Sequence, residues 1–207
     1  MPIKFLQILT LGVLLTLCFS CNQSSPTTAN KAPEIKKGVT PVADAEVAVI
    51  EMEQPAFGKV TIELYSNIAP EMVRRFKELA REGFYNGTAF HRINPSVVQG
   101  GDPVSKDYES KLVGSGKSTK PNVPAEFSDI PYDSGIVGAA RGPDLNSQNC
   151  QFFMTLKREQ GFDQKYTIFG KVIDGMNNVR TIAGVPRDGE KPLEPVRIKS
   201  VTIEAKK

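Results

Sequence analysis

The sequence predicts a mainly β fold, an antiparallel barrel or sandwich that also carries two helices. Short segments in which apolar and polar residues alternate recur between residues 46 and 204, which is the pattern of half-buried strands. Two other segments repeat apolar residues at helical spacing, and strands and helices do not alternate along the chain. The 207 residues are 40% hydrophobic and 8% aromatic, which is sufficient for one globular core.

The first two strands are predicted to form a hairpin. Apolar residues mark one strand between residues 47 and 52 and a second between residues 60 and 64. The sequence between them contains Pro55 and Gly58, which favour a turn. Further strands are predicted at 89–93, 97–100, 135–139, 151–156, 167–172 and 196–204. The alternation in the last strand breaks near Ser200, which indicates a β-bulge.

Two helices are predicted, and the first extends from Pro70 to Gly83. Proline suits the first turn of a helix, and glycine commonly ends one. Its buried face is marked by Val73, Phe76, Leu79 and Ala80. The second helix is shorter and extends from Gly175 to Gly184, with Met176, Val179 and Ile182 on one face. The long stretch 101–134 shows little periodicity, and a loop of this length in a compact domain is usually functional.

The N-terminus has the composition of an export signal. Lys4 precedes an apolar stretch, residues 5–19, and a helix that spans a membrane needs about 20 such residues. A positive start followed by a short apolar segment is typical of a signal peptide, and the alternative is an uncleaved membrane anchor.

Ser20-Cys21 follows the apolar stretch and resembles the acylation site of bacterial lipoproteins. Cys18 stands where leucine is usual, and Phe19 is bulkier than the usual residue. We therefore expect Cys21 to carry a lipid anchor, with simple secretion as the alternative. Asn22 in place of an aspartate favours an outer membrane, if the cell has one.

Residues 22–44 contain no aromatic residue and are dominated by Ser, Thr, Ala, Pro and Lys, which predicts a flexible tether. The expected organisation is an export signal at 1–20, a lipidated cysteine and tether at 21–44, and a folded domain at 45–207.

Charge and composition argue against several classes of function. The net charge is +3 and no basic block stands out, so nothing favours nucleic acid as a partner. His91 is the only histidine, which disfavours a metal site and suggests a structural, hydrogen-bonding role. After processing at Cys21, Cys150 would have no cysteine to pair with, and we expect it to be a small buried residue.

Several short segments occur in an order that resembles the cyclophilins, a family of peptidyl-prolyl cis-trans isomerases. They are Phe90-His91-Arg92-Ile93, Gln99-Gly100-Gly101-Asp102-Pro103, Pro124-Ala125-Glu126-Phe127, Gln151-Phe152-Phe153, Phe169-Gly170-Lys171-Val172 and Asp174-Gly175-Met176. The resemblance covers about residues 46–205. It implies a closed eight-stranded antiparallel barrel capped by two α-helices, with the active groove on its outer face and no cofactor.

The chemistry of the reaction suits these residues. Rotation about an X–Pro bond is opposed by amide resonance, a barrier of about 18–20 kcal/mol. Twisting the bond gives the prolyl nitrogen a lone pair that a fixed cationic donor can stabilise. The resemblance makes Arg92 the catalytic arginine and gives Gln99 the role of positioning it; an isolated arginine is more often a surface or ion-paired residue.

The resemblance also implies a substrate groove. Gln151 would bind the substrate main chain, and Phe153 would form the floor of the proline pocket. Phe152 would point into the barrel, because neighbouring strand residues face opposite ways. Ala140 and Gly142 would form a groove wall that lets the substrate backbone approach.

The sequence departs from the family pattern at two places. The Pro95–Val98 segment is one residue shorter, and Val97 stands where methionine is usual, which predicts a shallower proline pocket. Phe162 and Tyr166 occupy the positions of a leucine and a histidine in the pocket. Gly161 replaces the tryptophan that supports binding of cyclosporin in some members, so we expect weak cyclosporin binding.

The sequence leaves two functions open. The first is an isomerase that accelerates folding of exported, proline-containing polypeptides at the bacterial cell envelope, acting as a monomer that is anchored to the membrane by its lipid. The second is a non-catalytic, chaperone-like binder of proline-containing segments, which the altered Pro95–Val98 segment favours. The presence of Arg92, Gln99, Gln151 and Phe153 favours the enzyme.

Overall fold

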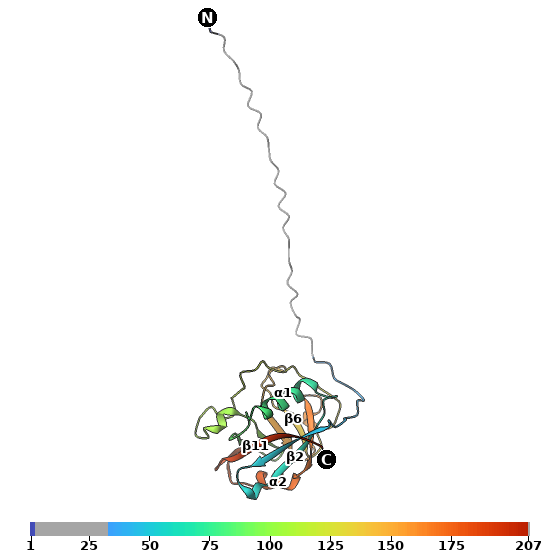
Figure 1. Ribbon diagram of the computed structural model, residues 1–207, viewed down its shortest axis with the longest axis vertical. Helices are drawn as coiled ribbons and strands as arrows, with labels where there is room; N and C mark the ends of the chain where they lie inside the picture. Colours follow the sequence, from blue (N-terminus) through green and yellow to red (C-terminus); the bar gives the residue numbers. More distant parts are fainter. Residues whose placement is uncertain (3–32, 207) are drawn as a thin grey trace. The chain divides into compact units, whose positions relative to one another are not determined.

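The computed structural model describes residues 1–2 and 33–206, and Figure 1 shows its course. Cys21 and almost all of the expected export signal lie outside the described residues. Within the described part, no helix is both long and apolar enough to cross a membrane.

The described residues form one large antiparallel sheet, whose strand order is β3-β11-β1-β2-β8-β6-β7-β5-β4. Its strands are β1 (Glu46–Met52), β2 (Lys59–Leu64), β3 (Ala89–Phe90), β4 (Arg92–Ile93), β5 (Val97–Gly100), β6 (Ile136–Ala139), β7 (Phe152–Thr155), β8 (Ile168–Asp174) and β11 (Val196–Ala205). The bulge predicted near Ser200 is found on β11, because Glu51 pairs with Ser200 and Met52 with Ile198, which leaves Lys199 unpaired.

The sheet closes on itself at His91. β3 and β4 stand at opposite ends of the strand order, yet only His91 separates them along the chain. The His91 backbone N–H donates to the carbonyl oxygen of Gln99 at 3.1 Å, so the two short strands continue one another. The closed eight-stranded barrel is thereby confirmed, and the ninth strand arises because the strand predicted at 89–93 is broken at His91.

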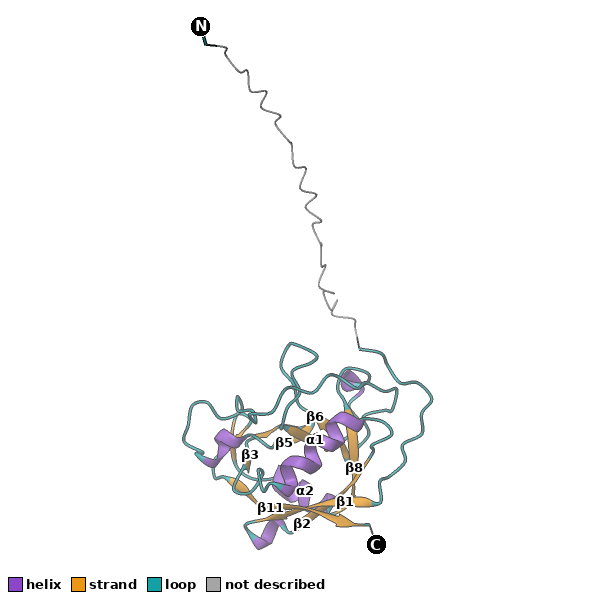
Figure 2. Cartoon of the chain, turned by 45° about the horizontal axis from the view of Figure 1, so that its top comes forward, coloured by secondary structure: helices purple, strands orange, loops and turns teal. Residues whose placement is uncertain are grey.

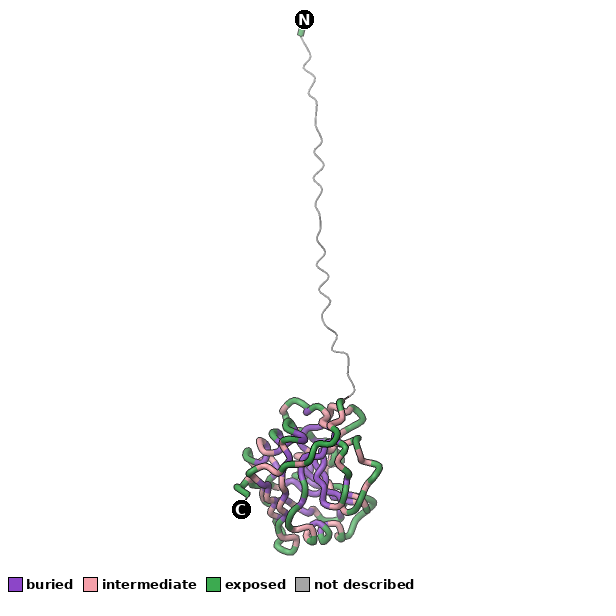
Figure 3. The backbone as a smooth tube through the Cα atoms, turned by 90° about the vertical axis from the view of Figure 1, so that its right-hand side faces the viewer, coloured by how far each residue is buried: buried purple, intermediate pink, exposed green. Residues whose placement is uncertain are grey.

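Two helices pack against the barrel, α1 (Pro70–Arg81) and α2 (Met176–Ala183), in agreement with the prediction. In Figure 1, α1 lies near the upper end of the barrel and α2 near its lower end. In the view of Figure 2, both helices are projected onto the space that the strands enclose. Phe76 of α1 enters the barrel, where its ring lies 5.4 Å from that of Phe152 and 5.3 Å from that of Phe169. The barrel interior is therefore filled by side chains and is the main core of the domain. In Figure 3 the buried segments gather in the middle of the domain.

The start of α1 is capped from a distant part of the chain. Ala69 stands at the N-cap and offers no side-chain acceptor. The carboxylate of Glu126 takes that role, accepting from the backbone N–H of Glu71 at 3.1 Å and of Met72 at 2.9 Å. The loop 101–134 is thus fastened to the helix through a residue of one of the family-like segments.

Smaller elements complete the domain. They are the 3₁₀ helices η1 (Pro55–Phe57), η2 (Pro103–Lys106) and η3 (Gln160–Phe162), and a two-stranded sheet of β9 (Arg187–Asp188) and β10 (Lys191–Pro192). The turn at η1 joins β1 to β2 as the predicted hairpin, and Gly58 there has a φ of 59°.

Residues 36–44, here called the N-terminal strap, lie against the domain, whereas their composition predicts that they belong to the flexible tether. The Lys36 N–H donates to the Phe127 carbonyl at 2.9 Å, and the Lys36 carbonyl accepts from Asp129 N–H at 3.0 Å. At the other end of the strap, Asp44 is paired with Lys77 of α1 at 2.5 Å. The strap is therefore held by polar contacts at both ends.

Candidate active site

Strand pairing places the family-like residues in one row on the outer face of the barrel. Arg92 of β4 is opposite Gln99 of β5, Gln99 is opposite Phe153 of β7, and Phe153 is opposite Gly138 of β6. Directly opposed residues of neighbouring strands point to the same face of a sheet. Phe152 points the other way, into the interior cluster, as predicted.

One pocket gathers most of the predicted site residues. It has a volume of about 170 Å³. It is lined by Arg92, Val97, Gln99, Ala140, Arg141, Phe153, Phe162 and Tyr166. Its apolar residues belong to a cluster outside the barrel that is separate from the interior core. The fold thus combines an apolar depression with a cationic rim, the arrangement that binds an apolar ring beside a polar bond.

Aromatic rings form the floor and two walls of this pocket. The centroid of the Phe153 ring lies 5.6 Å from that of Phe162 and 5.6 Å from that of Tyr166. Beneath it, the Tyr132 ring stacks at 5.8 Å, and burial raises the pKa of Tyr132 well above its ordinary value. Only glycine fits at position 138, because a Cβ there would collide with the Phe153 ring and stand 2.7 Å from the Tyr132 oxygen.

The shortened segment forms a tight turn between β4 and β5. The Asn94 side-chain oxygen accepts from the backbone N–H of Ser96 at 2.9 Å and of Val97 at 3.0 Å. Pro95 and Ser96 are left as the tip of the turn. Val97 is only 2% exposed, so this segment contributes an aliphatic wall, while Phe162 and Tyr166 supply the aromatic walls.

A chain of side-chain hydrogen bonds runs from Arg92 across the groove. Arg92 Nη1 donates to Gln99 Oε1 at 3.2 Å, and Gln99 Nε2 donates to Gln151 Oε1 at 3.0 Å. Gln151 Nε2 in turn donates to the carbonyl oxygens of Gly114 and Gly116, each at 2.9 Å. Gln151 thus orients Gln99 in this structure, and its expected bond to the substrate main chain stays a prediction.

Sequence reasoning missed Glu190, which pairs with the same arginine. Arg92 Nε donates to Glu190 Oε2 at 2.5 Å, and Arg92 Nη2 donates to Glu190 Oε1 at 3.4 Å. Asn94 Nδ2 donates to Oε1 at 2.8 Å. The hydrogen bonds from Arg92 and then from Asn94 hold the pKa of the Glu190 carboxyl below its usual value. No local pattern links residues 92 and 190, because a separate hairpin brings them together.

A second pocket continues the groove and has a volume of about 240 Å³. It shares Gln99, Ala140 and Arg141 with the first pocket, and the predicted Gly142 and Gln151 line it. Arg141, which the sequence analysis did not select, stands at the boundary with its guanidinium 4.7 Å from the centroid of the Tyr166 ring.

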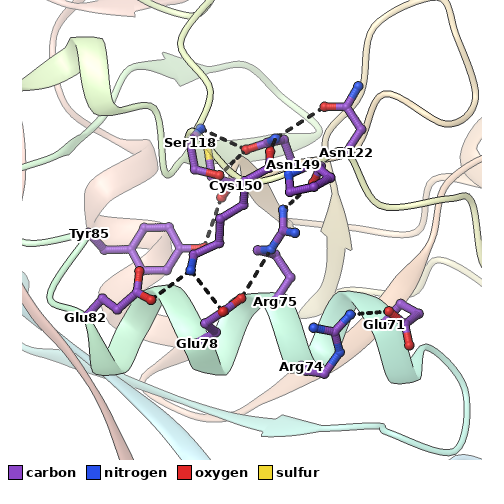
Figure 4. Close-up of polar contacts among 12 residues, drawn as sticks. Glu71, Arg74, Arg75, Glu78, Glu82, Tyr85, Ser118, Asn122, Asn149 and Cys150 are labelled. Atoms are coloured by element: carbon purple, nitrogen blue, oxygen red, sulfur yellow. Dashed lines mark hydrogen bonds and ion pairs between the residues drawn. The ribbon is translucent and has the colours of Figure 1, made fainter.

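The wall of the second pocket is fastened to α1, as Figure 4 shows. Asn149 accepts from the Ser118 backbone N–H at 2.8 Å and donates to the Lys120 carbonyl at 3.0 Å. The Lys120 ammonium pairs with Glu78 at 2.9 Å and with Glu82 at 2.8 Å. The loop whose carbonyl groups accept the hydrogen bonds from Gln151 is therefore held in place by α1.

His91 and Cys150 are both buried, and Cys150 lines the second pocket. Within the described chain neither ring nitrogen of His91 has a hydrogen-bond partner, so the hydrogen-bonding role expected from the sequence is not found. His91 is 6% exposed, and burial lowers its pKa, which favours the neutral ring. Cys150 is buried as predicted, and burial raises the pKa of its thiol to about 11. Among residues 1–2 and 33–206, no three His, Cys, Asp or Glu side chains are grouped as metal ligands would be.

Comparisons with known proteins agree with this geometry. Residues 48–203 match the family model for "Cyclophilin type peptidyl-prolyl cis-trans isomerase/CLD". A probable peptidyl-prolyl cis-trans isomerase of Brucella suis is 40% identical over 154 residues, which cover 72% of this chain and 79% of that protein. The mouse peptidyl-prolyl cis-trans isomerase-like 1 is 36% identical, covering 70% of this chain and 86% of that protein.

A solved structure shows the same fold. The crystal structure of a cyclophilin-type isomerase from Cryptosporidium parvum, determined in the presence of the dipeptide Ala-Pro, superposes with a TM-score of 0.69. Its sequence is 28% identical, and the match covers 77% of this chain and 99% of that chain.

Proposed function

This chain belongs to the cyclophilin-type peptidyl-prolyl cis-trans isomerases, and we propose that it lowers the barrier by electrostatic stabilisation of the twisted amide. The observation that supports this mechanism is the position of Arg92, whose guanidinium lines the rim of an apolar pocket while Gln99 orients it. A guanidinium stays charged and presents several N–H donors in one plane. Its donors stabilise the lone pair that appears on the prolyl nitrogen only when the bond twists.

The proline ring occupies the aromatic pocket in this proposal. The Cryptosporidium parvum protein was crystallised in the presence of Ala-Pro, and a pyrrolidine ring suits a depression floored by Phe153 and walled by Val97 and Tyr166. Burial of the ring places the preceding amide next to Arg92. The bound ring displaces water from the pocket side of the guanidinium, which strengthens the hydrogen bond donated on that side.

The mechanism is tested by isomerisation of a short X–Pro peptide with the purified protein and its Arg92→Ala variant. We expect kcat/KM to fall by roughly 10²–10³-fold, as it does when one preorganised donor is removed from other enzymes. Arg92→Lys keeps the charge but not the planar fork of donors, so we expect it to restore only part of the activity. Full activity of Arg92→Ala would contradict the electrostatic mechanism.

A chaperone-like binder of proline-containing segments is the second candidate. The observation that favours it is the turn at Pro95–Val98, which supplies Val97 and no aromatic ring to the pocket. The two candidates differ in one result. A binder retains proline-containing peptides, detected by calorimetry, but accelerates isomerisation of none of a panel that varies the residue before proline.

We also propose that the protein is a lipoprotein of the bacterial cell envelope that acts as a monomer on exported polypeptides. The support is the sequence: an apolar segment preceded by Lys4 and followed directly by Ser20-Cys21. Asn22 after the cysteine favours the outer membrane, where one exists. The domain would then face an extracytoplasmic space, where slow proline isomerisation limits folding.

Labelling of cells with radioactive palmitate tests the anchor. We expect label in the wild-type protein and in Cys150→Ala, the matched control because that thiol is buried in the domain. We expect none in Cys21→Ala. Label that persists in Cys21→Ala, or its absence from the wild type, would contradict lipidation at Cys21.

A further inference from the structure

We propose that Glu190 is a positioning residue for catalysis, because its carboxylate fixes the orientation in which Arg92 faces the pocket. The inference rests on the proposed role of Arg92. Glu190 accepts from Nε and Nη2 of the guanidinium, and Gln99 accepts from Nη1. A guanidinium has five N–H donors, so these three contacts leave one N–H on each terminal nitrogen for the substrate.

The backbone of Glu190 is attached to the strand that carries Arg92. The Ile93 N–H donates to the Glu190 carbonyl at 2.7 Å, and Arg187 Nη1 donates to the Ile93 carbonyl at 2.9 Å. Gly189 has a φ of 57°, which lets the chain turn between β9 and β10 directly before Glu190. The backbone of the hairpin therefore sets the position of the Glu190 carboxylate.

Tyr108 also holds the hairpin of β9 and β10 in place. Lys191 Nζ donates to the Tyr108 carbonyl at 2.9 Å, and the Tyr108 hydroxyl donates to the Pro192 carbonyl at 2.9 Å. Tyr108 is buried and belongs to the long loop 101–134. Contacts on both sides restrict the hairpin, which makes Glu190 a rigid partner for a side chain as long as arginine.

A contribution to folding stability does not account for the ion pair of Arg92 and Glu190. The Arg92 side chain is 45% exposed and that of Glu190 is 48% exposed, and ion pairs at such exposure contribute little to folding. The carboxylate also weakens the positive field of Arg92, but solvent screens that effect at this exposure. A displacement of a catalytic group by about 1 Å can reduce a rate by about 10²-fold, so orientation is the larger of the two effects.

The test compares kcat and KM of the purified wild-type protein, Glu190→Ala and Glu190→Gln on an X–Pro peptide. We expect Glu190→Ala to lower kcat about 5- to 20-fold with KM changed less than about 2-fold, because orientation affects the transition state more than ground-state binding. Glu190→Gln keeps one acceptor oxygen but loses the charge-assisted bond, so we expect an intermediate loss. Glu194→Gln is the matched control, an exposed glutamate without a hydrogen bond or ion pair within the described chain, and we expect it to leave kcat unchanged.

Two further readouts separate positioning from a merely structural role. In an Arg92→Ala background, Glu190→Ala should cause no further loss of kcat, because there is no guanidinium left to orient. The NMR signal of the Arg92 Nε–H should be protected from exchange in the wild type and lost in Glu190→Ala, while the melting temperature stays within a few degrees.

The outcomes distinguish the inference from the proposed function. Unchanged kcat in Glu190→Ala and Glu190→Gln, together with a large loss in Arg92→Ala, overturns only the role of Glu190. A rise in kcat in Glu190→Gln also overturns it, since the carboxylate would then act by weakening the charge of Arg92. Full activity in Arg92→Ala overturns the mechanism itself.

Discussion

The two faces of strand β7 differ in what they contribute. Phe152 points into the barrel, where its ring meets Phe76 at 5.4 Å and Tyr85 at 5.7 Å, each edge to face. Phe153, the next residue, points outward, is 4% exposed and forms the floor of the pocket beside Arg92. One strand therefore supports both the core and the site. The inner ring is surrounded on all sides by protein, while the outer ring has one side free for a ligand.

Burial alone does not separate core residues from site residues in this fold. Both rings are almost fully buried, and both belong to apolar clusters. The difference is whether the space next to the ring is filled by the protein or opens to the groove. Substitutions on the two faces should therefore affect different measurements.

The largest expected effect is on stability, through the inner face. Phe152→Ala leaves an enclosed cavity, and we expect it to lower the free energy of unfolding by about 3–5 kcal/mol. Phe153→Ala opens a space that water can enter from the groove, so we expect a smaller loss than for Phe152→Ala. Urea unfolding measures both, and equal losses would contradict the distinction between the faces.

Activity should show the reverse order. Phe153→Ala removes the pocket floor and should reduce kcat/KM of the folded protein mainly through KM. Phe152→Ala should retain kcat/KM at a temperature where it is still folded. A variant of Phe152 that loses activity while remaining folded would show that the inner face positions the site directly.

A smaller effect is expected from adding an aromatic ring to the outer face. Gly161 lies in η3 beside Phe162, and a Cβ at this position would meet no atom within 4 Å. We expect weak binding of cyclosporin by the wild type and binding about 5- to 150-fold tighter by Gly161→Trp, since burial of an aromatic ring contributes about 1–3 kcal/mol. Titration calorimetry measures the affinities, with Gly161→Ala as the control. Tight binding by the wild type would contradict the prediction.

The smallest effect that we expect is a pH dependence of folding stability that comes from His91. His91 joins β3 to β4, and burial lowers its pKa below the ordinary value of 6.5. The unfolded chain therefore binds a proton that the folded protein does not, so stability is retained above about pH 6.5 and decreases as the pH falls below it. We expect the urea midpoint of the wild type to fall between about pH 7.5 and about pH 5.

The His91→Gln variant isolates this contribution. Its midpoint should fall less over the same range, because glutamine does not titrate. Burial raises the pKa of Glu126, and carboxyls such as Asp163 have lowered pKa values, but these groups are the same in both proteins and cancel in the comparison. Equal pH dependence of the two proteins would show that His91 titrates alike in the folded and unfolded states.

The fold could be predicted because its core obeys simple periodicities. Alternation of apolar and polar residues located the strands of the large sheet. Helical spacing located both helices within two residues of their observed ends. The break at His91 could not be predicted, because the apolar pattern continues across it. The N-terminal strap was missed because polar contacts such as the bond from Val42 N–H to the Asn67 side chain hold it, and these leave no hydrophobic pattern.

The site was predicted in part for a different reason. Arg92, Gln99 and Phe153 lie on adjacent strands, so the resemblance to a family with this strand order placed them together. Glu190 was missed because its position depends on how a separate hairpin packs against β4. Arg141 was missed because its place between two pockets follows from the course of the loop after β6 and not from its residue type.

The closure of the barrel also has a consequence for the order of folding. The first strand of the domain pairs with the last, with Glu46 opposite Ala205, and among the described strands β3 pairs with β11 alone. During synthesis, the strand that leads into Arg92 therefore lacks its neighbour until residues 196–205 have emerged. The barrel can close only when the C-terminal end of the domain is available, so an unfinished chain holds most of the core residues in a sheet that is still open.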